Sequence, residues 1–368
     1  MSTIRFVHTD FLRLATPVSG ISDSPGWLQK LGGNCVRQAV RNVIDTAITQ
    51  EVDFLLIAGG ITESSVDLPA CTAWLDQQFE RLRENGIRII VNSRTEQEAA
   101  ILQPICDSVI RGQSRLVASL DPNGHLQFGE IHRPFDPARE ELVIHVGSAP
   151  AETGRTVYHA RPSLQPSDDV ELASRNGYLA LSAGAVQAVT PAETLEHGCL
   201  VIEANTVTRE LKSQFFITDV LRFATEELNL SSAITIDSLA SAVANASNSI
   251  GRMATQTVVI DWQVNAELVS ELSDVARFGE FELLHRLRAD VQSGHRGVWP
   301  RRIEFTSTSS LQVTSPVIES VEEYVQLVSG SVRSFDLDRF THRRRMLHGE
   351  SGVAPELIAG LSLLGRVA

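Results

Sequence analysis

The chain has 368 residues, of which 43% are hydrophobic and 21% charged, the balance of a soluble globular protein with room for two domains, or for one large domain with an appendage. Its net charge of −13 argues against a nucleic-acid-binding surface that covers the whole molecule, although it leaves room for a local basic patch. No apolar stretch reaches the roughly 18 residues of a membrane span and no signal-peptide pattern opens the chain, so we expect a cytoplasmic protein without a membrane partner.

The first hundred residues alternate between predicted strands and helices. Asn34 is a candidate N-terminal cap of the first helix, and Gly86 is a candidate terminator of the second. The alternation predicts a parallel sheet covered by helices. The predicted strands are 4–8, 52–58 and 87–93, and the predicted helices are 34–51, 71–86 and 95–106.

The middle of the chain is rich in predicted strands. Three of them follow one another within 115–148, and further strand-like segments cover 177–189 and 198–217. Joined to the preceding units, they predict two stacked sheets flanked by helices.

From residue 218 the pattern predicts a small second α/β module. Its expected elements are helices over 218–231 and 238–254, a strand over 255–264, a helix over 280–292 and a strand from 298. Two more helices are expected after residue 311. The predicted division is therefore 1–217, 218–310 and a helical C-terminal segment, 311–368.

The cysteines and lysines exclude several chemistries. Cys35, Cys71, Cys106 and Cys199 form no CxxC pair, so they are interpreted as buried structural thiols. Lys30 and Lys212 are the only lysines, and neither lies in a glycine-rich or strand-end setting that a P-loop or Schiff base requires.

Several blocks, in order and spacing, resemble the calcineurin-like metallophosphoesterases, and most of all the SbcD- and YhaO-type DNA repair exonucleases. The blocks include "IRFVHTDFLRL", "VDFLLIAGG", "GIRIIVNS", "LVIHVGS", "NGYLALSAGAV" and "GCLVIEAN". The resemblance covers about residues 1–310. It implies a four-layer α/β sandwich, with two mixed sheets flanked by helices, followed by a small α/β capping domain.

In that family two divalent metal ions, manganese in this branch, polarise the phosphodiester and generate the hydroxide nucleophile. The ligands belong to motifs at strand ends, written D-x-H, G-D, G-N-H-D, a lone His and G-H-x-H. Here most of those positions hold other residues. Without a gap the first motif falls on Phe11 and Arg13, and a shift by one aligns Asp10 but places Leu12 at the histidine. The remaining motif positions are Gly60, Arg94, Thr95, Glu96, His145, Ala183 and Ala185.

The resemblance therefore implies a protein that lacks the ligands for two metals and needs no cofactor, a pseudo-phosphoesterase. Asp10 and Glu96 are interpreted as solvated acids at strand ends, and His145 as a hydrogen-bonded histidine. The alternative is an active enzyme in which these three hold a single metal. Arg94 is also a candidate phosphate contact, because arginine binds phosphate through paired hydrogen bonds.

The C-terminal segment contains four closely spaced arginines, Arg339, Arg343, Arg344 and Arg345. They are interpreted either as contacts to DNA or an acidic partner, or as a solvated charged loop. In the active relatives, helices after the capping domain bind the coiled coil of an SMC-like ATPase of the SbcC type, and dimers are common. The leading hypothesis is a non-catalytic subunit that binds a partner or nucleic acid. A purely structural ATPase subunit is the third alternative.

Overall fold

The computed structural model describes residues 3–111, 114–120, 126–130, 141–147, 156–230, 236–253, 256–266, 284–285, 287–288 and 297–306. The chain divides into two compact units, Met1–Ser307 and Thr308–Ala368, and every described residue belongs to the first. The predicted helices after residue 311 and the four C-terminal arginines lie outside the described residues. The domain boundaries at 217 and 310 remain predictions.

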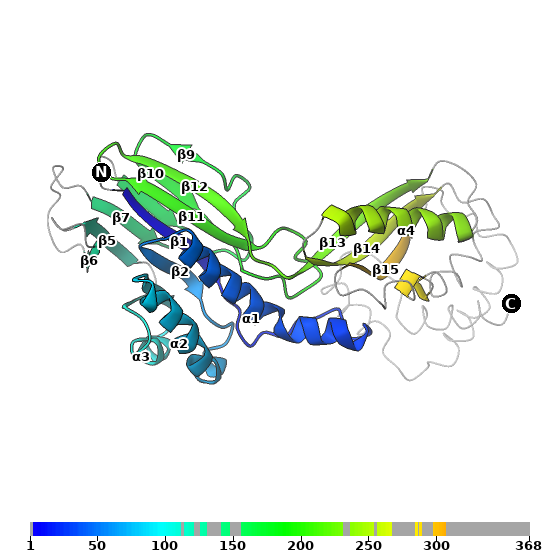
Figure 1. The fold of residues 1–368 in the computed structure, drawn as a ribbon, viewed down its shortest axis with the longest axis horizontal. Helices are drawn as coiled ribbons and strands as arrows, with labels where there is room; N and C mark the ends of the chain where they lie inside the picture. Colours follow the sequence, from blue (N-terminus) through cyan, green and yellow to red (C-terminus); the bar gives the residue numbers. More distant parts are fainter. Residues whose placement is uncertain are drawn as a thin grey trace, which may run out of the picture. The chain divides into compact units, whose positions relative to one another are not determined.

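The first sheet has seven strands in the order β4-β3-β2-β1-β11-β12-β9 (Figure 1). Strands β1 to β4 run parallel, as the alternating strands and helices predicted, and β11 joins β1 in antiparallel orientation. The strands are β1 (Thr3–Phe11), β2 (Phe54–Gly60), β3 (Arg88–Ser93), β4 (Ser108–Arg111), β9 (Ala173–Ser174), β11 (Gly198–Asn205) and β12 (Glu210–Ile217).

The second sheet has five strands in the order β10-β8-β7-β5-β6. The three consecutive strands predicted within 115–148 are confirmed, whereas the strand predicted over 177–189 is wrong beyond its first residues. Only Tyr178–Leu181 pairs as a strand, and the chain then turns through Gly184 at a φ of 77°. The strands are β5 (Ser114–Leu120), β6 (Leu126–Glu130), β7 (Glu141–Val146), β8 (Thr156–Ala160) and β10 (Tyr178–Leu181).

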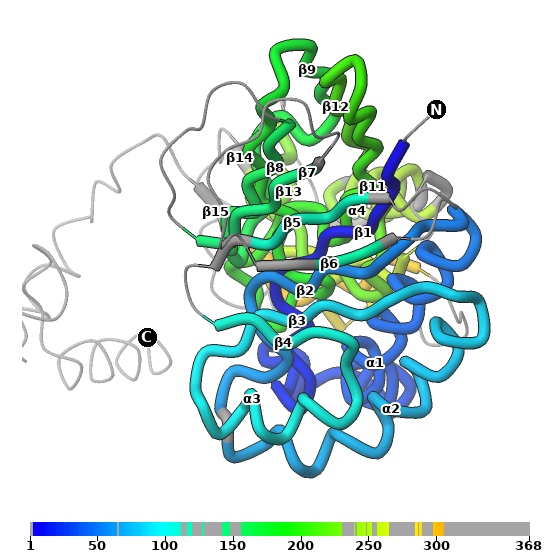
Figure 2. Tube along the Cα trace, turned by 90° about the vertical axis from the view of Figure 1, so that its left-hand side faces the viewer, coloured from blue at the N-terminus to red at the C-terminus, as the bar shows by residue number. Residues whose placement is uncertain are grey.

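Helices α1 (Gly26–Thr49), α2 (Leu68–Glu84) and α3 (Glu96–Leu102) cover one face of the first sheet (Figure 2), and the short 3₁₀ helix η1 (Ser65–Asp67) precedes α2. The predicted cap at Asn34 is wrong, because α1 begins at Gly26 after Pro25. The predicted stop at Gly86 is confirmed. Gly86 has a φ of 73° and follows the last turn of α2, where few side chains are tolerated.

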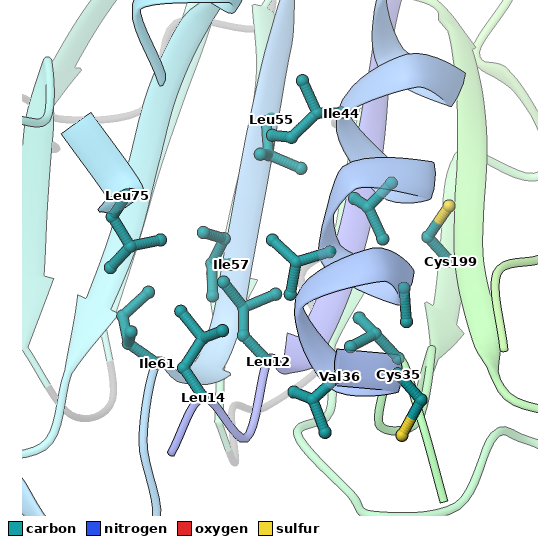
Figure 3. Packing of buried hydrophobic residues seen from close by; sticks show 14 of the residues in the cluster. Leu12, Leu14, Cys35, Val36, Ile44, Leu55, Ile57, Ile61, Leu75 and Cys199 are labelled. Carbon is teal, nitrogen blue, oxygen red and sulfur yellow. The ribbon is translucent and has the colours of Figure 1, made fainter. Parts of the chain in front are cut away.

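Two apolar clusters hold these layers together. One lies between the helices and the first sheet, where Val7 of β1 and leucines and isoleucines of β2 and of the loops after β1 and β2 meet α1 and α2 (Figure 3). The other lies between the two sheets and includes Ile4, Phe6, Phe54 and Tyr158. Strand β2 is buried along its whole length because both of its faces are covered, which explains its continuous apolar run.

The third sheet contains three parallel strands, β13 (Leu221–Leu230), β14 (Thr257–Ala266) and β15 (Val298–Thr306), with helix α4 (Ile236–Met253) packed against it. The helix predicted over 218–231 is wrong, because this segment forms β13. It pairs with β14 from Leu221 to Leu230, and its first residues alternate between buried and half-buried. Pairing and burial here override the high helix propensity of its leucine, alanine and glutamate residues. Most of the helix predicted over 280–292 lies outside the described residues.

The predicted architecture of two mixed sheets flanked by helices is thus confirmed. None of the helices that the structure describes is long and apolar enough to cross a membrane.

Candidate functional site

The ends of β1, β2 and β3 meet the loops 161–167 and 182–189 at one edge of the sandwich. Backbone contacts join them: the Leu12 N–H donates to the Gly60 carbonyl, the Val186 N–H donates to the Phe11 carbonyl, and Phe11 bridges Ala185. Most of the positions that correspond to metal ligands in the family lie here, so this edge is the candidate site.

Asp10 is fully buried, which corrects its interpretation as a solvated acid. It lies on the same face of β1 as Ile4 and Phe6, which pack between the two sheets. Its Oδ1 is 2.8 Å from His8 Nε2. Its Oδ2 accepts hydrogen bonds from three groups, Ser182 Oγ (2.8 Å), the Gly184 N–H (3.0 Å) and the Ser163 N–H (3.2 Å). Four groups thus surround this carboxylate.

His8 extends this network into the second sheet. Its Nδ1 lies 2.7 Å from the hydroxyl of Tyr158, which is also fully buried. Burial, together with the nearby charge of Asp10, raises the pKa of Tyr158 well above its usual value, so the phenol keeps its proton. With the tautomer that has its proton on Nε2, His8 donates to Asp10 and accepts at Nδ1 from Tyr158, which satisfies every group. The network links β1 to β8 and is closed to solvent.

The last two residues of β2 are glycines, and they leave room for side chains at the ends of the neighbouring strands. A Cβ atom at Gly59 would lie 2.8 Å from the ring of Phe11, so only glycine fits beneath that ring. Gly60 has a φ of 132°, a conformation that side chains rarely adopt, and a Cβ there would lie 3.4 Å from Arg94 Nε. The side chain of Arg94 therefore lies in contact distance of the position predicted from the sequence to correspond to the family's metal-bridging carboxylate.

Arg94 ties the end of β3 to the loop after β2. It donates hydrogen bonds to the carbonyls of Thr62 and Glu63 and forms a 2.8 Å ion pair with Glu98. The Glu98 carboxylate also accepts from the Arg94 N–H. Arg94 therefore has partners within the protein at each end of its guanidinium group.

Arg13 forms a second link at this edge. It is 5% exposed and lies between two carboxylates, Glu63 at 2.6 Å and Glu193 at 2.7 Å. Burial, the largest single effect, would raise the pKa of Glu193, but the hydrogen bonds from Arg13 and the Val189 N–H, together with the charge of Arg13, outweigh it and leave that pKa below its ordinary value. The ion pair with Glu193 is therefore retained at neutral pH. Arg13 joins the end of β1 to the loops that carry Glu63 and Glu193.

Thr95 and Glu96 occupy positions at the start of α3. The Thr95 hydroxyl accepts a hydrogen bond from the Glu98 N–H and caps the helix. The Glu96 side chain is 84% exposed and faces Arg111, as expected for a solvated acid.

His145 lies away from Asp10. It is buried in β7, where it alternates with Ile144 and Val146, which face the first sheet. His145 is therefore on the opposite face of the second sheet, beside His159 of β8, with 6.2 Å between the ring centroids. The structure does not bring Asp10, Glu96 and His145 together.

Ala183 and Ala185 are both fully buried against the loop 161–167. Ala183 bridges Pro166, and the Ala185 N–H donates to the Leu164 carbonyl. A histidine side chain at either position would need space that this loop fills.

A pair of divalent cations requires bridging anionic ligands, and the residues present do not fit such a pair. Gly60 and the two alanines offer no ligand atom, and the Asp10 oxygens already accept hydrogen bonds from four groups. Arg13 and Arg94 add positive charge. Within the described part of the chain, no three His, Cys, Asp or Glu side chains are grouped as metal ligands.

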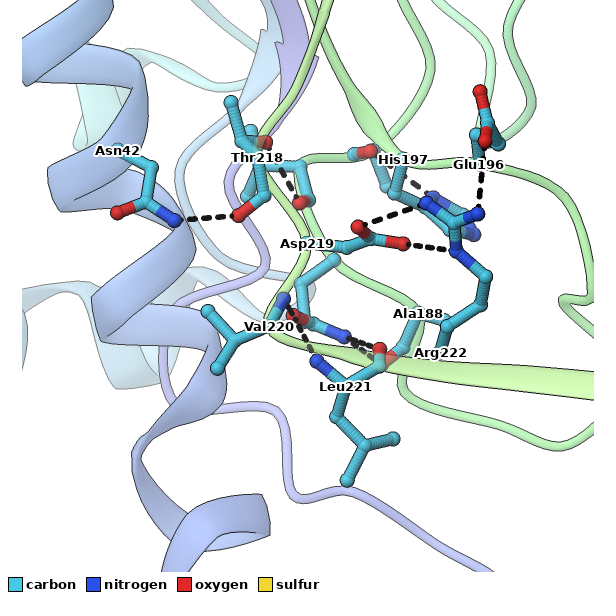
Figure 4. A network of polar contacts seen from close by, with 12 residues as sticks. Asn42, Ala188, Glu196, His197, Thr218, Asp219, Val220, Leu221 and Arg222 are labelled. Atoms are coloured by element: carbon cyan, nitrogen blue, oxygen red, sulfur yellow. Dashed lines mark hydrogen bonds and ion pairs between the residues drawn. The ribbon is translucent and has the colours of Figure 1, made fainter. Parts of the chain in front are cut away.

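A separate polar network lies beside the start of β13, the first strand of the third sheet (Figure 4). The side-chain amide of Gln187 donates to the carbonyls of Ala188 and Leu221 and accepts from the Val220 N–H. The carboxylate of Asp219 is paired with Arg222 at 2.9 Å. These contacts connect the loop after β10 to the start of β13.

His197, next to this network, is fully buried, and its Nδ1 is 3.0 Å from the Ala185 carbonyl. Burial lowers the pKa of His197, so it is neutral at physiological pH. Burial likewise raises the pKa of Asp219, although Arg222 opposes this effect.

An open depression of about 450 Å³ lies on the first sheet rather than at the strand ends, beside β1, β11 and β12. Its lining contains two cations, Arg5 and Lys212, and two carboxylates, Glu171 and Glu203, of which Arg5 and Glu203 are 2.9 Å apart. The lining therefore has no net charge that would select a ligand.

Motif comparison missed Tyr158, Ser182, Glu63, Glu98 and Glu193, which complete the networks around Asp10, Arg13 and Arg94. One signal was available, since the two-residue period of β1 puts His8 and Asp10 on the face of Ile4 and Phe6. The partners from distant loops had no such signal.

The two-sheet sandwich, with its candidate site at the strand ends, defines a metallophosphoesterase-like fold. The uncharacterized metallophosphoesterase YhaO of Bacillus subtilis (strain 168) is 34% identical to this chain over 91 residues. The match covers 25% of this chain and 22% of that protein, so the aligned part is about a fifth of the relative's length. No family model matches the chain. The similarity supports a distant relationship to the metallophosphoesterases.

Proposed function

We propose that this protein is a non-catalytic relative of the SbcD- and YhaO-type metallophosphoesterases, and that its sandwich serves as a scaffold for binding a partner or nucleic acid. The observation that carries the proposal is at Gly60. There a glycine with a φ of 132° stands at the expected metal-bridging position, and Arg94 occupies the adjacent space. Replacing Gly60 by a residue that coordinates metal would strain the backbone and place the new side chain against Arg94.

The ion pairs at the strand ends support a scaffold role. Metal ions in such a site also connect loops from several strands, and here Arg13 and Arg94 make connections of that kind through Glu63, Glu193 and Glu98. The chain therefore retains an ordered edge without the ligands for hydrolysis.

The test is a hydrolysis assay with the purified full-length protein and manganese, on single-stranded DNA, double-stranded DNA and bis-p-nitrophenyl phosphate. Metal content is measured on the same preparation. We expect no turnover above the buffer and far less than one bound metal per chain. Stoichiometric manganese, iron or zinc, with turnover abolished in Asp10→Asn, would refute the proposal, and that variant also distinguishes the protein's own activity from a contaminant.

The partner class is a further part of the proposal. The resemblance implies an SMC-like ATPase of the SbcC type, and the segment 311–368 is the part of this chain that would contact it. Co-purification of the ATPase with the full chain, and its loss on deletion of 311–368, is the expected result.

A further inference from the structure

A basic surface lies on α1 and α2, apart from the strand-end site. Arg37 and Arg41 are one turn apart on α1, and their Cζ atoms lie 5.7 Å and 5.8 Å from the ring centroid of Trp74 on α2. Both distances are within the range of a cation–π contact. The two arginines are exposed and Trp74 is half-buried. We refer to Lys30, Arg37, Arg41 and Trp74 as the arginine–tryptophan patch.

The basic residues of this patch have no ion-pair partner among the described residues, unlike the arginines of α2. Other arginines of α2 are paired, Arg81 with Asp45 at 2.5 Å and Arg83 with Asp76 at 3.1 Å. In the part of the chain that the structure describes, Arg37 and Arg41 form no ion pair with a carboxylate. Arginines without an ion-pair partner are notable on a chain of net charge −13.

The three basic residues form a stripe along α1. Lys30, Arg37 and Arg41 are separated by seven and four positions, so they project from one side of the helix, and all three are exposed. Along the helix axis the stripe spans about 16 Å. A polymer with regularly spaced negative charges is the ligand that matches several cations arranged in a row.

We propose that the arginine–tryptophan patch binds the phosphate backbone of a nucleic acid. The contact with Trp74 holds each guanidinium group in place and leaves N–H groups able to donate to a phosphate. A surface that binds another protein usually has an apolar centre, and Trp74 is the only apolar member of this patch. The large exposed hydrophobic side chains among the described residues are on other elements, namely Val66, Leu164, Leu172, Leu195, Val207 and Ile217.

The proposal does not depend on whether the strand-end site binds metal, since the patch shares no residue with that site. Binding through phosphates alone is independent of base sequence and weakens steeply with salt. Three basic residues predict a modest affinity.

Fluorescence anisotropy of labelled oligothymidylate and of a labelled duplex, measured with the full chain over a series of salt concentrations, tests the proposal. We expect the double variant Arg37→Ala/Arg41→Ala to bind about tenfold more weakly at low salt. The slope of log affinity against log salt should fall by about 1.4 for the single strand and about 1.8 for the duplex. Arg37→Lys/Arg41→Lys should keep the wild-type slope, because it keeps the charge.

The matched control is Arg81→Ala/Arg83→Ala, which removes two paired arginines from the neighbouring helix. It should bind within about twofold of the wild type, since those charges are already compensated. Unfolding temperatures verify that each variant is folded. Salt-dependent binding that survives in Arg37→Ala/Arg41→Ala would overturn the proposal, as would the absence of DNA binding in the wild type. Binding of poly-glutamate but not DNA would assign the patch to an acidic protein partner instead. None of these outcomes bears on hydrolysis, so they are distinct from a failure of the proposed function.

Discussion

Asp10 is buried between the two sheets, and its carboxylate accepts hydrogen bonds from His8, Ser182 and two backbone N–H groups. Asp10→Ala would leave these buried donors without an acceptor. We expect the variant to lose about 3–5 kcal/mol of unfolding free energy, measured by urea denaturation. Asp10→Asn keeps one carbonyl oxygen and should lose less.

The control for this measurement is Asp23→Ala, because Asp23 is exposed and should contribute within about 0.5 kcal/mol. An alanine variant at Asp10 as stable as the control would mean that the network does not stabilise the fold.

Gly60 offers a second test at a single residue. Its φ of 132° is unfavourable for any side chain, so Gly60→Ala should cost about 1–3 kcal/mol of stability. Gly33→Ala is the comparison, because Gly33 lies exposed inside α1 and a Cβ there meets nothing within 4 Å. That change should leave the protein equally stable or raise its stability by up to about 1 kcal/mol. Thermal unfolding of both variants tests this prediction, and equal losses of stability in the two would contradict it.

At the scale of the elements, the buried His197 makes the stability of the junction before β13 depend on pH. Its folded-state pKa is lowered by burial, so the unfolded chain binds the proton more readily. Stability from this residue is present above the unfolded value near 6.5 and is lost as the pH falls below it. Asp219, whose pKa is raised, acts in the opposite direction at lower pH.

His197→Asn should reduce this dependence. An asparagine amide can replace the Nδ1 hydrogen bond to the Ala185 carbonyl and does not titrate. Urea denaturation between about pH 7 and pH 5 should show a smaller loss of stability in the variant than in the wild type. A parallel loss in both proteins would place the pH dependence elsewhere.

The local sequence pattern predicts some helices and strands well and others poorly. Strand β2 and helix α2 follow from a continuous apolar run and from a terminal glycine, which are local signals. Strand β13 does not, because "LRFATEELNL" favours a helix by propensity and becomes a strand through its pairing with β14. The start of α1 was missed for a related reason, since its first turns carry Gly32 and Gly33, residues of low helix propensity.

At the scale of the whole molecule, the Arg–carboxylate links predict that stability is independent of divalent metal. A ligand stabilises a fold only when it binds the native state more tightly than the unfolded chain. We expect manganese or a chelator to leave the unfolding temperature of the full-length protein unchanged, as measured by differential scanning fluorimetry. A chelator-induced fall in that temperature would reveal a structural metal.

The candidate site was predictable only in part. The positions Gly60, Arg94, Ala183 and Ala185 follow from the order of motifs along the chain. Their present contacts do not, because Arg13 and Glu193 are 180 positions apart and only the assembled sandwich brings them together. The burial of Asp10 likewise depends on the loop that carries Ser163.

The backbone at Gly60 has a consequence for how such a protein can change over time. An acidic residue introduced there would first incur conformational strain, and histidines at Ala183 or Ala185 would enter filled space, before either gained a metal to bind. Each single substitution that would add a metal ligand at this edge is therefore unfavourable by itself.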